Sequence, residues 1–405
     1  MGYTKEAIIG VSWLGAFRLF TRALSFLRTI IVARILSPAQ FGVYGIAALV
    51  LSLVEILTET GINVFLIQNK DNIGKYVSTA WIVSIIRGAL ISSLIFSSSF
   101  FVAGFFKSPD ALALLMLVSV VPLIRGFINP SVAKFQKDLQ FHKEFYYRSG
   151  IFLVETIVAI LLIIVMKNPI ALIYSLIAGA IFEVTISLLF IKPVPIIEFS
   201  KKIFKEIISR GKWITGAGIF SYLFQNADNA VVGKTLGTGA LGIYDMAYSI
   251  STLPLNEISD IVARVTFPVY VRMSDDKRRL RRAYIRTILL TVGLVSPILL
   301  LLLLFPEQLI LLFLGEKWIQ AADVLRVLAI FAMFSILGSP SGAVFYAVKK
   351  QKYLTVISFV SFVVMIVSIF PLINQFGLVG AGIAAILGSL AALPFMIFYL
   401  IKVLR

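Results

Sequence analysis

Residues 36–47 of the chain read Leu36-Ser-Pro-Ala-Gln-Phe41-Gly42-Val43-Tyr44-Gly-Ile-Ala47, and a related stretch, Leu236-Gly-Thr-Gly-Ala-Leu241-Gly242-Ile243-Tyr244-Asp-Met-Ala247, follows 200 residues later. Leucine, glycine, tyrosine and alanine recur in register between the two stretches. The same offset aligns Trp13 with Trp213, Phe20 with Phe220 and Arg34 with Lys234, and an offset of 210 aligns Pro130–Phe135 with Pro340–Phe345. This self-similarity predicts that the chain consists of two related halves.

The apolar content of the chain indicates a membrane protein. Of its 405 residues, 59% are hydrophobic and 14% are charged, against about 25% charged in soluble domains. A helix that crosses the bilayer needs about 20 mostly apolar residues. We therefore predict an all-α integral membrane protein with about twelve transmembrane helices, at residues 9–35, 40–66, 77–104, 111–133, 148–166, 169–191, 213–235, 241–270, 284–305, 321–347, 353–374 and 377–401.

The repeat predicts how these helices are organised. Each half contains six spans, an even number, so both halves enter the membrane in the same orientation and are related by a pseudo-two-fold axis along the membrane normal. We expect an N-terminal six-helix lobe over residues 1–191, a cytoplasmic linker over 192–212 and a C-terminal six-helix lobe over 213–405. Two such lobes are typical of alternating-access transporters, whose substrate site lies near the bilayer midplane between the repeats.

The distribution of basic residues predicts the orientation. The chain has 37 Lys+Arg and 20 Asp+Glu, a formal net charge of +17, and most of the basic residues fall between spans on the side that holds both termini. By the positive-inside rule both termini are cytoplasmic in a multi-pass protein of the cell (inner or plasma) membrane. The run Lys277–Arg282 fits a cytoplasmic loop beside anionic lipid. Because the positive charge lies between spans, we expect no nucleic-acid partner.

Several classes of function are excluded by what the sequence lacks. There is no cysteine and one histidine, His142, which excludes disulfides and thiolate ligands and argues against a histidine metal site. We expect neither a metal nor a cofactor. The sequence has no large polar loop with paired carboxylates, which argues against a membrane enzyme. The first apolar stretch contains three arginines and no short cleavable core, so we expect the N-terminus to be retained.

Charged residues inside the predicted spans mark the candidate transport path. Arg18, Arg22 and Arg28 share one face of the first span with hydroxyl side chains. An arginine in the middle of a spanning helix costs about 2.5–3.5 kcal/mol, so this face must contact other helices or a hydrated cavity. The other candidates are Glu55, Glu59, Arg87, Arg125, Glu257, Asp260 and Arg264.

These charges have two interpretations. In the first, Arg18 and Arg22 pair with Glu55 and Glu59, and Arg264 pairs with Asp260, as buried ion pairs that hold helices in register. In the second, the surplus of arginines in the first four spans lines a cavity for an anionic head group, because arginine offers bidentate donors suited to phosphate.

Asp228 raises a separate hypothesis. The repeat offset places it opposite Arg28, and each lies six residues before a basic residue, Lys234 or Arg34, so their depths in the membrane match. We expect the two to form a gate pair across the pseudo-two-fold axis on the extracytoplasmic side. A cation or proton site at Asp228 is the alternative.

The stretches Ala33–Tyr44, Glu59–Ile62 with Ile67-Gln68, and Asp228–Tyr244 closely resemble the polysaccharide transporter family. These are the oligosaccharide-lipid flippases of the superfamily that also contains the multidrug and toxin extruders and the lipid II flippase. The resemblance covers essentially the whole chain. It implies a flippase that moves a polyprenyl-pyrophosphate-linked oligosaccharide from the cytoplasmic to the outer leaflet by rocking of two lobes. A cation-coupled small-molecule or drug antiporter of the same superfamily is the alternative.

The resemblance also implies site residues and partners. In related flippases the cavity arginines come from the first, second and eighth helices, which carries over to Arg18, Arg22, Arg28 and Arg264, while the second span offers Glu55 and Glu59 in place of an arginine. Arg87 and Arg125 are pyrophosphate-binding candidates from the residues alone. Glu55, Glu59, Asp228, Glu257 and Asp260 are the candidates for gating or ion coupling. Expected partners are the lipid-linked oligosaccharide and the bilayer, with polysaccharide polymerases and glycosyltransferases as further candidates, and a monomer suffices for transport.

Overall fold

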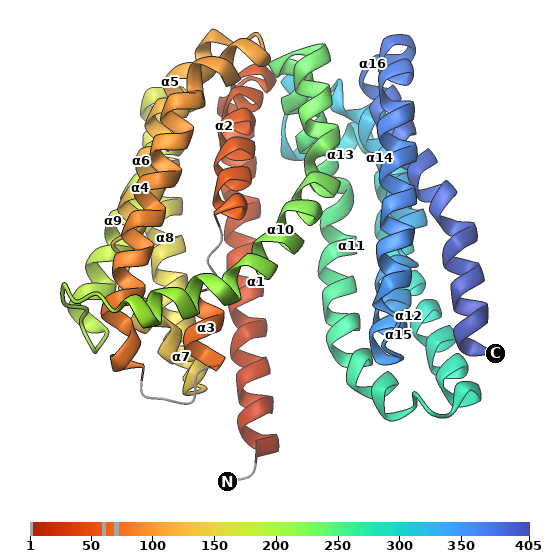
Figure 1. Cartoon of the computed structure of the whole chain (residues 1–405). Coiled ribbons are helices and arrows are strands. Elements are labelled where there is room, and N and C mark those ends of the chain that lie inside the picture. Colours follow the sequence, from red (N-terminus) through yellow and green to blue (C-terminus); the bar gives the residue numbers. More distant parts are fainter. Residues whose placement is uncertain (1–2, 59–61, 69–72) are drawn as a thin grey trace. The chain divides into compact units, whose positions relative to one another are not determined.

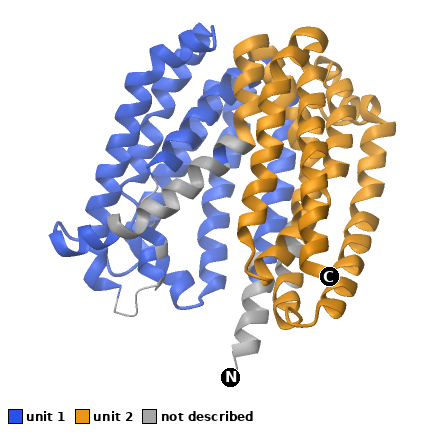
Figure 2. Cartoon of the chain, turned by 45° about the vertical axis from the view of Figure 1, so that its right-hand side comes forward, with its two compact units in different colours: residues 1–223 blue, residues 224–405 orange. Residues whose placement is uncertain are grey.

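The computed structural model describes residues 3–58, 62–68 and 73–405, and within its helices it leaves the side chains of 3–12, 14, 64, 68, 208–221, 223–224, 254, 260–261 and 263–265 undescribed. Glu59 and the side chains of Asp260 and Arg264 therefore lie outside the described residues. The described chain is helical and contains no strand (Figure 1). It divides into two compact units, Met1–Leu223 and Phe224–Arg405 (Figure 2).

Unit 1 is built from long helices joined by short turns. Its elements are α1 (Tyr3–Ile35), α2 (Pro38–Leu57), α3 (Ile62–Gln68), α4 (Gly74–Phe105), α5 (Pro109–Val118), α6 (Val120–Arg125), η1 (Pro130–Ala133), α7 (Lys134–Lys137), α8 (Phe141–Met166), α9 (Ile170–Phe190) and the part of α10 (Lys201–Leu236) up to Leu223. Helix α8 packs against α1 and α9, and α4 packs against α5 and α6.

Unit 2 holds the rest of the helices around α11 and α14. Its elements are the end of α10, α11 (Thr238–Arg272), α12 (Lys277–Leu304), α13 (Pro306–Phe313), η2 (Glu316–Trp318), α14 (Ala321–Ser335), α15 (Gly338–Ala347) and α16 (Gln351–Leu404). Helix α11 packs against α12, α14 and α15, and α14 also packs against α16. Helix α16 breaks at Gly377, where φ is 56°, a left-handed conformation that glycine adopts without steric cost.

The repeated sequence stretch lies at the same kind of turn in each unit. In unit 1 it joins α1 to α2, where Ser37 and Gln40 form a capping box: the Gln40 N–H donates to Ser37 Oγ, and the Ser37 N–H donates to Gln40 Oε1. In the second repeat it joins α10 to α11 through Gly237, whose φ is 88°. The repeated leucine is the last residue of α10 in the second repeat, Leu236, and the first residue after α1 in the first repeat, Leu36.

The helices have the length and surface of membrane spans. Within the described residues, seven helices are long and apolar enough to cross a membrane, or eight if the bent pair Pro109–Arg125 and Pro130–Lys137 is one span. Helices α1, α10 and α11 have 33, 36 and 35 residues, longer than a hydrocarbon core of about 30 Å requires. Large apolar side chains such as Val165 and Phe190 are 80% and 77% exposed, as expected beside lipid tails. The protein is an all-α integral membrane protein, and the count of twelve spans stays a prediction.

Several predicted spans differ from the observed helices. The span expected at 40–66 is two helices, because α2 ends at Leu57 and α3 begins at Ile62. The span expected at 111–133 breaks at Ser119, just before Pro122, which has no backbone N–H to donate, and it turns through 71° between Arg125 and Pro130.

Three further helices begin earlier than expected. Helix α8 begins at Phe141 rather than at residue 148, α10 at Lys201 rather than at 213, and α12 at Lys277 rather than at 284. These helices include charged residues that the hydropathy pattern places in loops, and residues 201–212 of the expected linker belong to α10.

Candidate functional site

A cavity of about 280 Å³ in unit 1 is the candidate functional site. Its wall is formed by residues of α2, α3, α4, α6, η1, α8 and α9, and by Ile128 and Asn129 before η1. Its charged lining residues are Glu55, Arg87, Arg125, Arg148 and Glu183. The structure thus brings together three of the residues predicted from sequence, Glu55, Arg87 and Arg125, although they come from three different helices.

Arg87 on α4 is bound to the end of α2. Its Nε donates to the carbonyl of Thr58 and its Nη2 donates to the carbonyl of Glu55, both at 2.8 Å. The last carbonyls of a helix have no partner inside the helix and carry the negative end of its dipole. The Arg87 guanidinium therefore acts as a charged cap that ties α2 to α4 at the wall of the cavity.

Arg125, the last residue of α6, faces Glu55 across the cavity wall. Its Nη1 lies 3.7 Å from Glu55 Oε1, close enough for an ion pair but beyond the usual length of a hydrogen bond. The Arg125 Nε is buried and has no hydrogen-bond acceptor among the described residues. The Arg125 side chain as a whole is 35% exposed, so the groups that it can offer to a ligand in the cavity are its terminal Nη atoms.

The position of Arg125 is fixed by close packing of two helices. A Cβ atom on Gly88 of α4 would lie 2.4 Å from the carbonyl oxygen of Pro122 in α6, and one on Gly126 would lie 3.0 Å from the carbonyl oxygen of Ser84. The backbones of α4 and α6 thus meet at two glycines directly beside Arg125. Such contact leaves little freedom for the helix end that carries the guanidinium.

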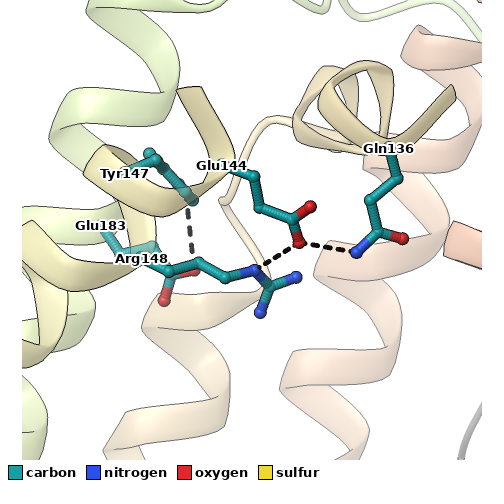
Figure 3. A network of polar contacts seen from close by, with 5 residues as sticks. All are labelled: Gln136, Glu144, Tyr147, Arg148 and Glu183. Atoms are coloured by element: carbon teal, nitrogen blue, oxygen red, sulfur yellow. Dashed lines mark hydrogen bonds and ion pairs between the residues drawn. The ribbon is translucent and has the colours of Figure 1, made fainter. Parts of the chain in front are cut away.

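The guanidinium of Arg148 on α8 is held by a hydrogen bond from one of its atoms, Nε. Its Nε donates to Glu144 Oε1 at 2.8 Å, and the same oxygen accepts a hydrogen bond from Gln136 Nε2 at 2.6 Å. On the other side of Arg148, the Tyr147 hydroxyl donates to Glu183 Oε1 at 3.5 Å (Figure 3). The Glu144 side chain is 5% exposed and the Arg148 side chain 47%, so a buried carboxylate anchors a guanidinium that reaches the cavity.

The arginines of α1 lie elsewhere. Arg28 Nη1 forms an ion pair with Glu155 Oε1 of α8 at 2.8 Å. Arg18 is half-buried and Arg22 is exposed on the same helix. In the described part of the chain, the lining of the cavity includes none of these three arginines. Their expected contact with pyrophosphate stays a prediction, as does the same role for Arg264.

Asp228 belongs to a buried polar cluster in unit 2. Its carboxylate accepts hydrogen bonds from the Tyr244 hydroxyl at 3.0 Å and from the backbone N–H of Asn229 at 2.9 Å. The side-chain amide of Asn229 donates to Asp245 Oδ1 at 3.4 Å and so joins two carboxylates. Asp228, Asn229 and Tyr244 are all buried. Arg28 and Asp228 thus each have a partner within their own unit, and the gate pair stays a prediction.

Sequence reasoning missed several residues of these clusters. Arg148 is the first residue of the predicted span 148–166 and is not among the candidates, although Glu144 and Arg148 have the i, i+4 spacing of a helical ion pair. Glu155 and Glu183 lie inside predicted spans and are not among the candidates either. Tyr244 stood in the repeated stretch, but its bond to Asp228 depends on how α10 and α11 pack. Glu257 is half-buried on α11.

Solved structures with the same fold are membrane transporters. The fold is similar to that of the lipid II flippase MurJ in an inward closed conformation, with a TM-score of 0.73 and 15% identity over 96% of this chain and 88% of that chain. It is also similar to an inward-facing multidrug resistance MATE family transporter of the MOP superfamily, with a TM-score of 0.68 and 17% identity over 95% and 94% of the two chains.

Three curated relatives are named for the biosynthesis of lipopolysaccharide, teichuronic acid or a glycan. The chain is 25% identical over 400 residues to the lipopolysaccharide biosynthesis protein WzxC of Escherichia coli (strain K12), covering 96% of this chain and 79% of that protein. It is 26% identical to the teichuronic acid biosynthesis protein TuaB of Bacillus subtilis (strain 168), covering 85% and 72%. It is 24% identical to the probable low-salt glycan biosynthesis flippase Agl15 of Haloferax volcanii, covering 91% and 78%.

The family is identified by a match to a family-wide sequence pattern. Residues 31–323 match the family described as polysaccharide biosynthesis protein. The match runs from the end of α1 into α14, and so takes in every helix that lines the cavity and the Asp228 cluster. The chain belongs to the family of polysaccharide biosynthesis proteins.

Proposed function

We propose that the protein is a flippase that carries a lipid-linked oligosaccharide across the membrane for the synthesis of a cell-surface polysaccharide. The observation that carries this proposal is membership of the polysaccharide biosynthesis protein family over residues 31–323. The names of relatives from two bacteria and an archaeon support it, since one is a probable flippase and two act in lipopolysaccharide and teichuronic acid synthesis.

The charged cavity of unit 1 fits this task physically. Sugars and phosphates cannot cross about 30 Å of hydrocarbon unaided, because their polar groups would lose their hydrogen bonds to water. A helical protein with exposed apolar surfaces and a cavity lined by Arg125 and Arg148 can supply replacements for those bonds. The lipid tail then stays in the bilayer while the polar head passes along the protein.

We propose a polyprenyl pyrophosphate as the lipid carrier and alternating access of two lobes as the mechanism. The substrate leaves chemically unchanged, so the protein has no catalytic residue. In this proposal both termini lie in the cytoplasm, and transport runs from the cytoplasmic to the outer leaflet. A membrane potential that is negative inside drives an anion in this direction with about 2.3 kcal/mol per charge per 100 mV. A monomer supplies the whole path, and polymerases and glycosyltransferases act before and after it.

A second candidate function is a cation-coupled antiporter of small molecules. The observation that favours it is the pair of carboxylates, Asp228 and Asp245, joined through Asn229 inside unit 2. Carboxylates in an apolar interior bind a proton or a cation rather than remain charged side by side. The same pair serves a flippase equally well as its site of ion coupling, so the two functions differ in the substrate and not in the cluster.

Reconstitution separates the two functions. The purified protein is placed in liposomes with a short-chain polyprenyl-pyrophosphate oligosaccharide, and sugar exposed at the outer surface is removed by an added glycosidase. A flippase makes nearly all of the glycan accessible, whereas protein-free liposomes leave the inner half protected. Cation-dependent efflux of a small amphiphile, with the glycan still protected, would establish the antiporter instead.

A further inference from the structure

The three guanidinium groups of the unit 1 cavity are not equivalent. Arg87 uses Nε and Nη2 on two carbonyls at the end of α2. Arg125 lines the cavity with a side chain that is 35% exposed, and its Nη1 lies 3.7 Å from Glu55 Oε1, longer than a hydrogen bond, so its Nη atoms are available to a ligand. Arg148 is held only through Nε by Glu144 in the described contacts, which leaves its Nη atoms for acceptors in the cavity. Arg125 and Arg148 are therefore the two groups with donors to offer a ligand.

The same cavity presents acceptors beside these donors. The carboxylates of Glu55 and Glu183 line it, and the Tyr147 hydroxyl that donates to Glu183 lines it as well. Asn129 also lines the cavity, but its Nδ2 donates to the carbonyls of Ser187, Ile191 and Pro193, and its Oδ1 accepts from the Ser131 N–H. Asn129 is thus part of the scaffold, and the binding groups are two cations and two carboxylates.

This mixture selects a class of ligand. A simple anion site would surround its ligand with donors alone, since a carboxylate repels phosphate. Hydroxyl groups, in contrast, both donate and accept, and need guanidinium donors on one side and carboxylate acceptors on the other. A volume of about 280 Å³ is just below the smallest usual ligand pockets, of about 300 Å³, and suits a single ring rather than a whole oligosaccharide.

We propose that the cavity between α2, α4, α6, α8 and α9 binds one sugar residue that carries an anionic group, either a carboxylate or a phosphate. Arg125 and Arg148 bind the anionic group, and Glu183 accepts hydrogen bonds from the ring hydroxyls. The inference rests on the proposed function, because it makes this cavity the place where the flippase recognises part of its glycan. Arg87 has a positioning role only.

Binding of simple sugars to the full-length protein in detergent tests this site. The probes are glucuronate, glucose 1-phosphate, glucose and inorganic phosphate, and the readouts are the midpoint of thermal unfolding and tryptophan fluorescence. Trp81 is a suitable reporter, since its indole N–H donates to the carbonyl of Phe127 at 2.9 Å, next to the lining residue Ile128. We expect glucuronate or glucose 1-phosphate to raise the midpoint and glucose to leave it unchanged. Which of the two acts identifies the anionic group.

Variants assign the effect to the two arginines. Arg125→Gln and Arg148→Gln should each weaken binding about tenfold or more, as for a lost hydrogen bond between charged groups. Because Arg148→Gln leaves the buried Glu144 carboxylate without its cation, the double variant Glu144→Gln/Arg148→Gln is measured beside it and should fold and bind equally weakly. Arg326→Gln is the matched control, since Arg326 lies in unit 2 near Glu307 and Asp323, and it should bind as the wild type does.

Several results would overturn the proposal. The first is an unfolding midpoint that neither anionic sugar shifts, and the second is unchanged binding in both arginine variants. The third is a midpoint shift with glucose equal to that with the anionic sugars. The fourth is an equal shift with inorganic phosphate and with glucose 1-phosphate, without any shift with glucuronate. The proposed function fails separately. Wild-type protein that flips the lipid-linked glycan without binding any sugar probe contradicts only the site, whereas binding without flipping contradicts only the function.

Discussion

Arg28 of α1 donates from Nη1 to Glu155 Oε1 of α8 at 2.8 Å, and the two side chains are 23% and 12% exposed. The guanidinium also lies 5.4 Å from the ring centre of Phe152 on α8. A Cβ atom on Gly179 of α9 would lie 3.3 Å from Glu155 Cβ, so a third helix packs against the stem of the carboxylate. Three helices of unit 1 thus meet around one ion pair.

Loss of one partner of this pair should destabilise the protein. Arg28→Ala leaves the Glu155 carboxylate without its cation, and breaking a buried pair in this way costs about 3 kcal/mol. The double variant Arg28→Ala/Glu155→Ala should cost less than the sum of the single variants, because the second substitution removes the charge that the first left unpaired. Unfolding in detergent, followed by circular dichroism, measures all three.

The exposed pair of Arg326 and Asp323 provides the control. Its side chains are 42% and 71% exposed at 3.3 Å, and the same cycle there should give a coupling below about 1 kcal/mol. Additive effects at Arg28 and Glu155 would contradict a structural role for the pair. The corresponding cycle on transport with Arg28→Ala and Asp228→Ala tests the gate pair, which predicts coupling between them.

Arg87 should matter for stability more than for recognition. Arg87→Met removes both hydrogen bonds to the end of α2 and should lower the free energy of unfolding by about 2 kcal/mol, since two helix carbonyls lose a charged donor. Arg87→Lys should restore part of the loss through its charge alone. The measurement is unfolding in denaturant, with sugar binding recorded on the same samples. Loss of binding at unchanged stability would show that Arg87 contacts the ligand.

Gly88 and Gly104 on α4 form a matched pair of positions. A Cβ on Gly88 would lie 2.4 Å from the backbone oxygen of Pro122, whereas nothing lies within 4 Å of a Cβ on Gly104. Gly88→Ala should therefore separate α4 from α6 and destabilise the protein by about 1–3 kcal/mol or more. Gly104→Ala should be neutral or stabilising by up to about 1 kcal/mol, because alanine favours the helix. Equal effects in thermal unfolding would show that α4 and α6 do not touch at Gly88.

Much of the architecture could be predicted from hydropathy and from the repeat. Both depend on local sequence, and so the helices and the repeated turn could be predicted, and Glu55, Arg87 and Arg125 could be named as candidates because they are charged residues inside predicted spans. The contacts that charged residues make with side chains of other helices could not be predicted, because those helices are distant in the chain. Glu155 meets Arg28 across 127 residues, and nothing in either span specifies that contact. Arg148 was missed because the apolar run begins after it, while α8 begins at Phe141.

The Asp228 cluster should couple transport to an ion gradient. Asp228→Asn keeps the size of the side chain but removes the charge that binds a proton or cation, so transport driven by an imposed proton or sodium gradient should be lost with the fold intact. Asp275→Asn, at an exposed position before α12 in the same unit, should transport as the wild type does. Gradient-driven uptake into proteoliposomes measures both. Undiminished gradient dependence in Asp228→Asn would exclude the cluster as the coupling site.

The most direct test of the central claim is the rate at which a polyprenyl-pyrophosphate oligosaccharide reaches the outer surface of proteoliposomes. We expect wild-type protein to make the inner-leaflet glycan accessible to an added glycosidase, and protein inactivated by heat to leave it protected. We further expect Arg125→Gln to slow this transfer for a glycan with an anionic sugar, and Arg326→Gln to leave the rate unchanged. Glycan that stays protected in the presence of correctly folded wild-type protein would contradict the assignment as a flippase.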